Sequence, residues 1–293
     1  MSAINPIGPV SVAAPPDLRS IPADVALLRS PRYLGIRPRS RKVSVLLRTS
    51  IPVVLFAGWW YGTASGRIPE AVLASPREVL SALVDLKQSG ELSAFLLASL
   101  YRAGLGLALG ASVGLTLGVL SGLTALGEEL VDPTMQMLRS VPFLALVPLL
   151  ISWFGIDERF KIVLIAAASA FPMYAYSYLG VRGVDRKLVE AARGFGLRGW
   201  RLLVMVILPG ALPNLLMALR ICMAISVVGL IAAEQVGTTQ GIGYLVLLAK
   251  QYYRQDYMVL CIVFYATLGL LLDGFIRVLE RTLMPWRRGS TMR

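Results

Sequence analysis

Long apolar stretches alternate with short polar segments along most of the 293-residue chain. About 20 consecutive apolar residues are needed for a helix to cross the hydrocarbon core of a bilayer. Six stretches reach that length, at about 43–62, 94–121, 134–154, 160–180, 214–234 and 258–279. This pattern predicts an all-α membrane protein with about six transmembrane helices, in one transmembrane domain over 43–286.

The two ends of the chain lack this pattern. Residues 1–42 are rich in Pro, Ala and Arg and contain no apolar run long enough for the core of a signal peptide. They are predicted to form a disordered basic tail, and 287–293 a second, short basic tail.

Lys and Arg are distributed unevenly between the segments that connect the spans. Segments 1–42, 122–133, 181–213 and 280–293 together hold 17 of them, whereas 63–93, 155–159 and 235–257 hold 6. Cytoplasmic loops of membrane proteins carry the excess of basic residues. The asymmetry predicts that both termini are cytoplasmic, although 122–133 carries only acids, which weigh little in this rule.

Composition excludes several classes of function. Hydrophobic residues make up 56% and charged residues 16% of the chain, the mean hydropathy is +0.67, and there is no histidine and only two cysteines. No metal site and no catalytic residues are therefore expected, because the usual His- and Cys-based chemistries lack their ligands and bases. A net charge of +12 is typical of basic cytoplasmic loops in so apolar a chain, and no nucleic-acid partner is expected.

A glycine recurs every four residues along the second span, at Gly106, Gly110, Gly114, Gly118 and Gly122. Such a stripe lets another helix approach closely. It is compatible with tight packing inside one subunit, with pairing of two subunits, or with helices that slide past one another.

The stretch EAARGFGLRGWRLLVMVILPGALP, residues 190–213, lies between the fourth and fifth spans. A short amphipathic helix from Asp185 to about Gly194 is expected, followed by a second one over 200–207. The two prolines of LPGALP are expected to break the chain before the fifth span begins. The result would be a helix-turn-helix elbow on the cytoplasmic surface, with room above Gly196 for a side chain of another protein.

The elbow resembles the EAA signature of ATP-binding-cassette importer permeases. The matching residues are Glu190, Ala191, Ala192, Gly196, Val206, Leu208 and Pro209, with Val206 where the family usually has isoleucine. The resemblance implies a type I importer permease fold in which segment 185–213 is the coupling helix that docks on a cytoplasmic ATPase. An amphipathic helix resting on lipid headgroups is the alternative.

Further stretches resemble the nitrate, sulfonate and taurine branch of these permeases, and the likeness extends over about 45–286. They are 138–155, 171–184, 219–246 and 268–286. The resemblance favours a small organic anion such as an aliphatic sulfonate or taurine as the substrate. Nitrate, bicarbonate and a vitamin precursor remain alternatives.

The chain contains no G-x-x-x-x-G-K-[ST] phosphate loop. It is therefore not expected to be an enzyme or to bind a cofactor, and ATP and Mg²⁺ are expected on a separate chain. The resemblance implies an ATPase dimer, a second copy of the permease, and a periplasmic or lipid-anchored binding protein as partners. It places the assembly, with its membrane lipid, in a bacterial inner membrane.

Two prolines and a few charges are candidates for the substrate pathway. Pro142 and Pro148 are expected to bend the third span, which would either line the pathway or pack as a kinked helix. The ionisable residues within predicted spans are Arg48, Arg102, Arg139, Lys161, Arg220, Glu234, Asp273 and Arg277. Arg102 and Arg220 lie several residues inside a span, where each would either help an anion across or make a structural contact.

Glu234 ends the fifth span, before a glycine-rich turn that would gate the path, dock a partner or simply cap the helix.

Tyr174, Tyr176 and Tyr178 are expected in an aromatic belt at the membrane interface.

Two other classes of function remain as alternatives to an importer permease. One is an ATP-independent channel or secondary transporter, which would have no use for the elbow. The other is an intramembrane enzyme, for which the sequence offers neither histidine nor a G-x-S-x-G motif.

Overall fold

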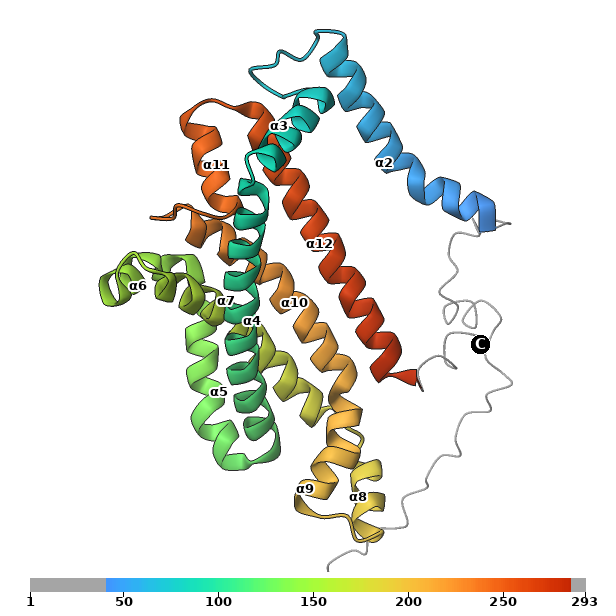
Figure 1. Ribbon diagram of the computed structural model, residues 1–293. Helices are drawn as coiled ribbons and strands as arrows, with labels where there is room; N and C mark the ends of the chain where they lie inside the picture. Colours follow the sequence, from blue (N-terminus) through green and yellow to red (C-terminus); the bar gives the residue numbers. More distant parts are fainter. Residues whose placement is uncertain (1–40, 286–293) are drawn as a thin grey trace, which may run out of the picture. The chain divides into compact units, whose positions relative to one another are not determined.

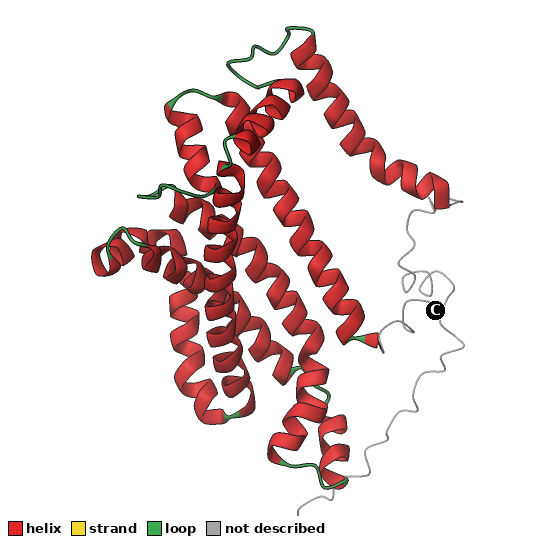
Figure 2. Cartoon of the chain, viewed as in Figure 1, coloured by secondary structure: helices red, strands yellow, loops and turns green. Residues whose placement is uncertain are grey.

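The computed structural model describes residues 41–285, and every regular element among them is a helix (Figures 1 and 2). The tails predicted at 1–42 and 287–293 lie outside these residues, apart from 41 and 42. The elements are α2 (Arg41–Ala64), α3 (Pro76–Gln88), α4 (Glu91–Leu123), α5 (Ala125–Ser140), η2 (Phe143–Leu146), α6 (Val147–Phe154), α7 (Glu158–Arg182), α8 (Arg186–Gly194), α9 (Gly199–Leu202), η3 (Leu203–Ile207), α10 (Leu208–Glu234), α11 (Ile242–Gln251) and α12 (Gln255–Leu283). The chain divides into two units after Ala57, and the unit that begins at Gly58 is described below.

Four helical segments are long and apolar enough to cross a membrane: α4, α7, the stretch Gly199–Glu234 and α12. They coincide with the second, fourth, fifth and sixth predicted spans, and the all-α membrane fold is confirmed. Helix α2 covers the first predicted span.

The bend expected in the third span, 134–154, is present, and it is sharp. Helix α5 ends at Ser140, and its axis makes an angle of 86° with the following helical segment, Phe143–Phe154. Proline disfavours helical backbone in the residue before it, and Val141 is extended, with φ −82° and ψ 122°. Pro142 caps the 3₁₀ turn η2, and Pro148 occupies the first turn of α6, where its missing N–H costs nothing.

The expected break at LPGALP is wrong, because the helix continues through both prolines from Gly199 to Glu234. Pro209 lies in the first turn of α10, and Pro213 lies inside it. One turn of π-helix, η3, comes directly before them. A local π turn is one of the adjustments by which a membrane helix re-satisfies backbone groups freed by proline.

The glycine stripe packs α4 against α7 within one subunit. All of Gly106, Gly110, Gly114 and Gly118 are buried. A Cβ added at Gly106 would lie 2.6 Å from Cβ of Ile165, and one added at Gly110 would collide with the carbonyl of Ala166. Of the three roles open to the stripe, the structure shows close packing inside the subunit.

The second unit has two distinct ends, which are named here by the helices that lie there (Figure 1). The α8 end carries α8 and α9. The α11 end carries α3 and α11, which share a hydrophobic core with the start of α4 and with α12, built around Ala82, Phe95, Leu245 and Leu260. Helix α10 runs between the two ends.

Candidate functional site

The elbow at the α8 end is built by local backbone chemistry. Helix α8 begins where the Asp185 side chain accepts a hydrogen bond from the Lys187 N–H at 2.9 Å. It ends in a Schellman motif, in which the Leu197 N–H donates to the Ala192 carbonyl at 3.1 Å. Gly196 provides the left-handed residue of this motif, with φ +84°. Glycine at this position is thus required by the backbone, and the space around it is open.

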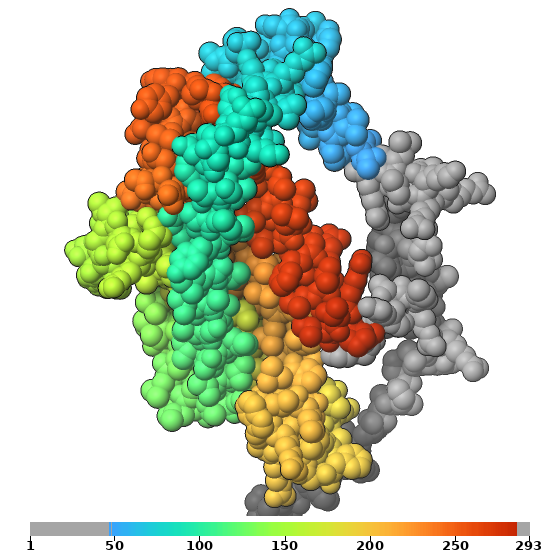
Figure 3. Space-filling model, viewed as in Figure 1, coloured from blue at the N-terminus to red at the C-terminus, as the bar shows by residue number. Residues whose placement is uncertain are grey.

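The elbow presents large apolar side chains to its surroundings. Phe195 is 89% exposed, Trp200 73% and Leu188 53%. Of the EAA residues, Ala192 is buried against the elbow, whereas Glu190 and Ala191 are exposed. Figure 3 shows the elbow projecting at one end of the second unit. Exposed large apolar side chains of this kind are typical of a surface that contacts a protein partner or the membrane interface.

The remaining EAA residues form the base of the elbow. Val206, in η3, and Leu208 and Pro209, at the start of α10, are all half-buried. A groove of about 450 Å³ lies between α8, η3 and the α4–α5 connection, and Glu190, Arg193 and Ile207 line it. The motif therefore combines an exposed face with a base continuous with α10.

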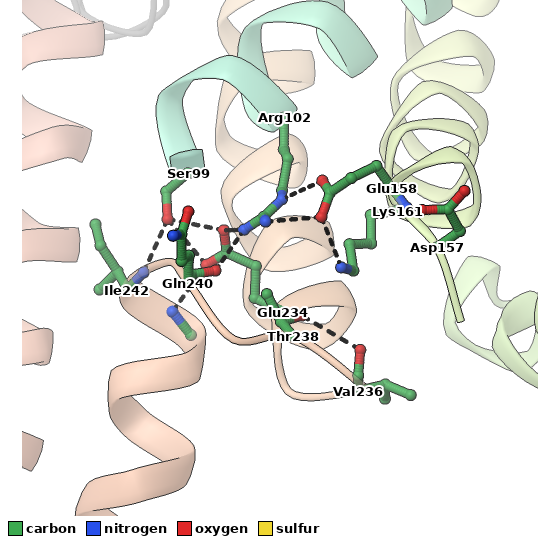
Figure 4. A network of polar contacts seen from close by, with 11 residues as sticks. Ser99, Arg102, Asp157, Glu158, Lys161, Glu234, Val236, Thr238, Gln240 and Ile242 are labelled. Carbon is green, nitrogen blue, oxygen red and sulfur yellow. Dashed lines mark hydrogen bonds and ion pairs between the residues drawn. The ribbon is translucent and has the colours of Figure 1, made fainter. Parts of the chain in front are cut away.

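A buried network of charged groups joins three helices at the α11 end (Figure 4). Arg102, on α4, donates from Nε and Nη2 to the Glu158 carboxylate on α7, at 2.6 and 2.8 Å. Its Nη1 donates to Glu234 Oε1, at the end of α10, and to the Gln240 carbonyl, both at 2.7 Å. Lys161 Nζ adds an ion pair to Glu158 at 2.9 Å. Two cations and two anions are thus brought together and balance one another.

The Glu234 carboxylate is fully buried at the centre of this network. It accepts from the Ser99 hydroxyl at 2.8 Å and from the Gly243 N–H at 2.8 Å, in addition to Arg102. A Cβ at Gly241 would collide with this carboxylate, and one at Gly243 would lie 2.6 Å from Glu234 Cβ. The two glycines let the backbone of the turn close over the acid. A buried charge is tolerated when it is paired and hydrogen-bonded in this way.

The network acts as a joint that holds α4, α7, α10 and the turn before α11 together. Arg102 and Glu234, two candidates for the pathway, form an ion pair with one another here. No group of ligands that could hold a metal ion occurs among the described residues. Sequence reasoning missed Ser99 and Glu158. Ser99 could have been found, since Ser99, Arg102 and Gly106 lie on one helical face.

The other pathway candidates lie elsewhere. Arg220, on α10, donates to Glu280 at 3.1 Å and lies 3.5 Å from Asp273, both on α12, beside a mainly apolar cavity of about 370 Å³. Pro142 and Pro148 flank the η2 turn and contribute to the bend between α5 and α6. The structure does not bring these residues together with Arg102 and Glu234.

Comparison with known proteins gives a family match over more than half of the chain. The model of the family described as binding-protein-dependent transport system inner membrane component matches residues 114–285. A putative aliphatic sulfonates transport permease of Bacillus subtilis is 40% identical over 86% of this chain and 91% of its own length. One of Escherichia coli is 44% identical over 80% and 90%, and the E. coli taurine transport system permease is 34% identical over 88% and 95%.

Solved structures share the fold at low sequence identity. An inward-facing methionine ABC transporter, MetNI, aligns with a TM-score of 0.58 and 20% identity over 64% of this chain and 94% of its own. An amino acid ABC transporter aligns with a TM-score of 0.54 and 21% identity over 68% and 97%. These likenesses establish the helical arrangement alone.

Proposed function

Because the chain belongs to the family of binding-protein-dependent transport system inner membrane components, we propose that it is the permease subunit of an ATP-driven importer of aliphatic sulfonates. The observation that carries the substrate class is the identity of 40 to 44% to two permeases named for aliphatic sulfonates, over at least 80% of the chain. The 34% identity to a taurine permease keeps the substrate within the same chemical class.

The elbow is the proposed dock for the partner ATPase. Its exposed Phe195 and Trp200 provide aromatic contacts of the kind that dominate protein interfaces, and Glu190 adds a charge beside them. The chain has no phosphate loop of its own, so ATP and Mg²⁺ are bound by that partner. The exposed aromatic elbow favours the importer over an ATP-independent channel, because a channel has no ATPase that would bind there.

The orientation follows from the same assignment. The elbow faces the cytoplasm, where the ATPase lies, and both termini are on that side by the distribution of basic residues. The α11 end then faces outward, toward a periplasmic or lipid-anchored binding protein that delivers the substrate. Two copies of the permease in the inner membrane enclose the path, each resting on one subunit of the ATPase dimer.

Movement of the elbow reaches the outer end through α10. The helical stretch Gly199–Glu234 has 36 residues, or about 54 Å at 1.5 Å per residue. Its first turn belongs to the elbow, and its last residue, Glu234, is fixed to α4 and α7 by the buried network. When the ATPase subunits close on ATP, the elbows approach and each rigid group of helices tilts, which exchanges inward-facing for outward-facing access.

Transport is tested in a bacterium that lacks its own sulfonate permeases. The chain is expressed there with its cognate ATPase and binding protein, and uptake of ³⁵S-labelled taurine and ethanesulfonate is followed. We expect uptake that requires all three proteins and ATP, and that excess nitrate does not inhibit. Uptake of nitrate instead of either sulfonate, or uptake without the ATPase, would refute the proposal.

Docking is tested by copurification of the ATPase with variants of the elbow. Gly196→Asp and Glu190→Ala are expected to lose the ATPase, as is Phe195→Ala. Gly196→Asn separates the effect of backbone strain from the effect of a side chain in the open space. Asparagine tolerates the left-handed backbone but still fills that space. Tyr252→Ala is the matched control, since Tyr252 is an aromatic residue 73% exposed at the α11 end. Equal copurification with all variants would remove the elbow as the dock.

A further inference from the structure

Helix α5 differs from the other helices around it because none of its residues is buried within one copy of the chain. One of its faces is polar, with Asp132, Gln136 and Arg139 at helical spacing. Arg139 lies in the last turn of α5. Charged side chains within membrane segments usually face protein or a water-filled cavity, so this face is expected to contact water or protein.

A cavity of about 170 Å³ lies between this face and α7. Asp132, Gln136 and Arg139 line it from α5, and Phe171, Tyr174 and Tyr178 from α7. Pockets for drug-sized ligands usually have about 300 to 1,000 Å³. This cavity therefore suits a solute of only a few heavy atoms.

The tyrosines belong to this cavity. Tyr174 is buried, and its hydroxyl donates to Asp132 at 3.0 Å, while the Tyr178 hydroxyl donates to Glu128 at 2.7 Å. Their rings are stacked, with centroids 6.2 Å apart. The aromatic-belt prediction thus does not fit Tyr174, whose side chain is directed at α5 and forms a wall of the cavity.

The charges in the cavity are not fully used. Asp132 accepts from Tyr174 and from Gln136, the latter at 2.6 Å, and each carboxylate oxygen can accept again. Arg139 is exposed, and its side chain has no hydrogen bond or ion pair within residues 41–285. The cavity thus offers one free guanidinium and one carboxylate with spare capacity.

We propose that this cavity is a substrate subsite of the permease itself, in which Arg139 binds the sulfonate and Asp132 the ammonium group of a two-carbon aminosulfonate. The inference rests on the proposed function and adds a site within the membrane part of the importer. A planar guanidinium can give two parallel N–H···O bonds to an oxyanion, which makes Arg139 the specific contact for the sulfonate. Asp132 then favours the zwitterion over a simple sulfonate.

The test measures binding without the binding protein. The permease–ATPase complex is placed in nanodiscs of phosphatidylcholine, where no anionic headgroup competes for Arg139, and equilibrium binding of ³⁵S-labelled taurine and ethanesulfonate is measured. We expect saturable binding of both. Arg139→Gln should weaken both by about tenfold to a hundredfold, as expected for loss of a charge-assisted pair. Arg139→Lys, which keeps the charge without the fork, should fall between.

Asp132→Asn distinguishes the two ends of the ligand. It should weaken taurine by about tenfold and leave ethanesulfonate unchanged, since only taurine carries the ammonium group. Arg159→Gln is the matched control, because Arg159 is an exposed arginine at the other end of α7. Each variant is compared per assembled complex, after size-exclusion chromatography.

The outcomes separate this inference from the proposed function. Absence of saturable binding, or equal binding by the Arg139→Gln and Arg159→Gln complexes, overturns the subsite, and sulfonate uptake by wild-type cells would still support the importer. An equal effect of Asp132→Asn on both ligands overturns the ammonium assignment. Absence of both binding and sulfonate uptake overturns the two proposals together.

Discussion

Replacement of Arg102 by methionine is expected to destabilise the protein strongly. It removes the guanidinium at the centre of the buried network and leaves an unbranched, apolar side chain in its place. Arg102 makes four hydrogen bonds, two to Glu158, one to Glu234 and one to the Gln240 carbonyl. After the change, the fully buried Glu234 keeps only neutral donors.

The magnitude follows from the exposure of the two acids. Breaking a buried ion pair by removing one partner costs about 3 to 5 kcal/mol. The Glu158 side chain is 45% exposed and still pairs with Lys161, so its contribution is reduced, whereas Glu234 is 0% exposed. A loss of about 3 kcal/mol in the free energy of unfolding is therefore expected.

A double-mutant cycle isolates the pair. Glu234→Gln alone leaves the Arg102 charge with one partner fewer, but Arg102→Met combined with Glu234→Gln leaves no unpaired charge between these two positions. The double variant should therefore cost less than the sum of the single variants, with a coupling of about 2 kcal/mol. Arg220→Met is the control without a fully buried partner. The side chains of Arg220, Asp273 and Glu280 are 35 to 38% exposed, so this change should cost less than Arg102→Met.

The assay is reversible unfolding of the purified permease in mixed micelles of increasing SDS content, followed by tryptophan fluorescence and far-UV circular dichroism. If the Arg102→Met variant unfolds like the Arg220→Met variant, the network does not hold the helices together. Additivity of the two single changes to within about 0.5 kcal/mol would equally contradict a direct interaction between Arg102 and Glu234.

Three further substitutions test the packing. Gly110→Val should prevent accumulation of folded permease, because the valine side chain would collide with the α7 backbone. Gly104→Val, at a position with open space, should be tolerated. The two variants are compared by their yield from membranes after size-exclusion chromatography. Gly243→Ala should lower the SDS midpoint by displacing the Glu234 carboxylate, while Gly274→Ala should not, since nothing lies within 4 Å of a Cβ there. Ser99→Ala should cost about 1 to 3 kcal/mol in the same unfolding assay, because its hydroxyl serves both a buried carboxylate and the N–H at the start of α11; an unchanged midpoint would mean that water replaces it.

The sequence by itself determined the class of fold and the position of the elbow. Apolar runs of membrane-spanning length and the spacing of glycines along α4 follow from local periodicity, which the chain carries without any knowledge of its neighbours. The family likewise follows from the EAA motif and its place between two spans. The prediction of α8 was accurate because its cap residue, Asp185, and its terminating glycines are local signals.

Effects of proline were only partly readable from the sequence. The same residue type bends the chain by 86° near Pro142 and leaves α10 continuous at Pro209 and Pro213. The difference is that one site places proline after a completed helix, whereas at the other a π turn directly precedes the helix that contains Pro209 and Pro213. Such compensation depends on backbone hydrogen bonding over several residues, which residue identity does not specify.

Which charges meet was decided only by tertiary structure. Arg102, Glu158 and Glu234 are separated by 56 and 76 residues and come from three helices. Each charge alone could be interpreted as a pathway residue, a lipid anchor or a structural contact, because the cost of burying it depends on the partners that the fold provides. Packing of α4 on α7 along the glycine stripe brings them together, and it leaves Arg139 facing a cavity instead.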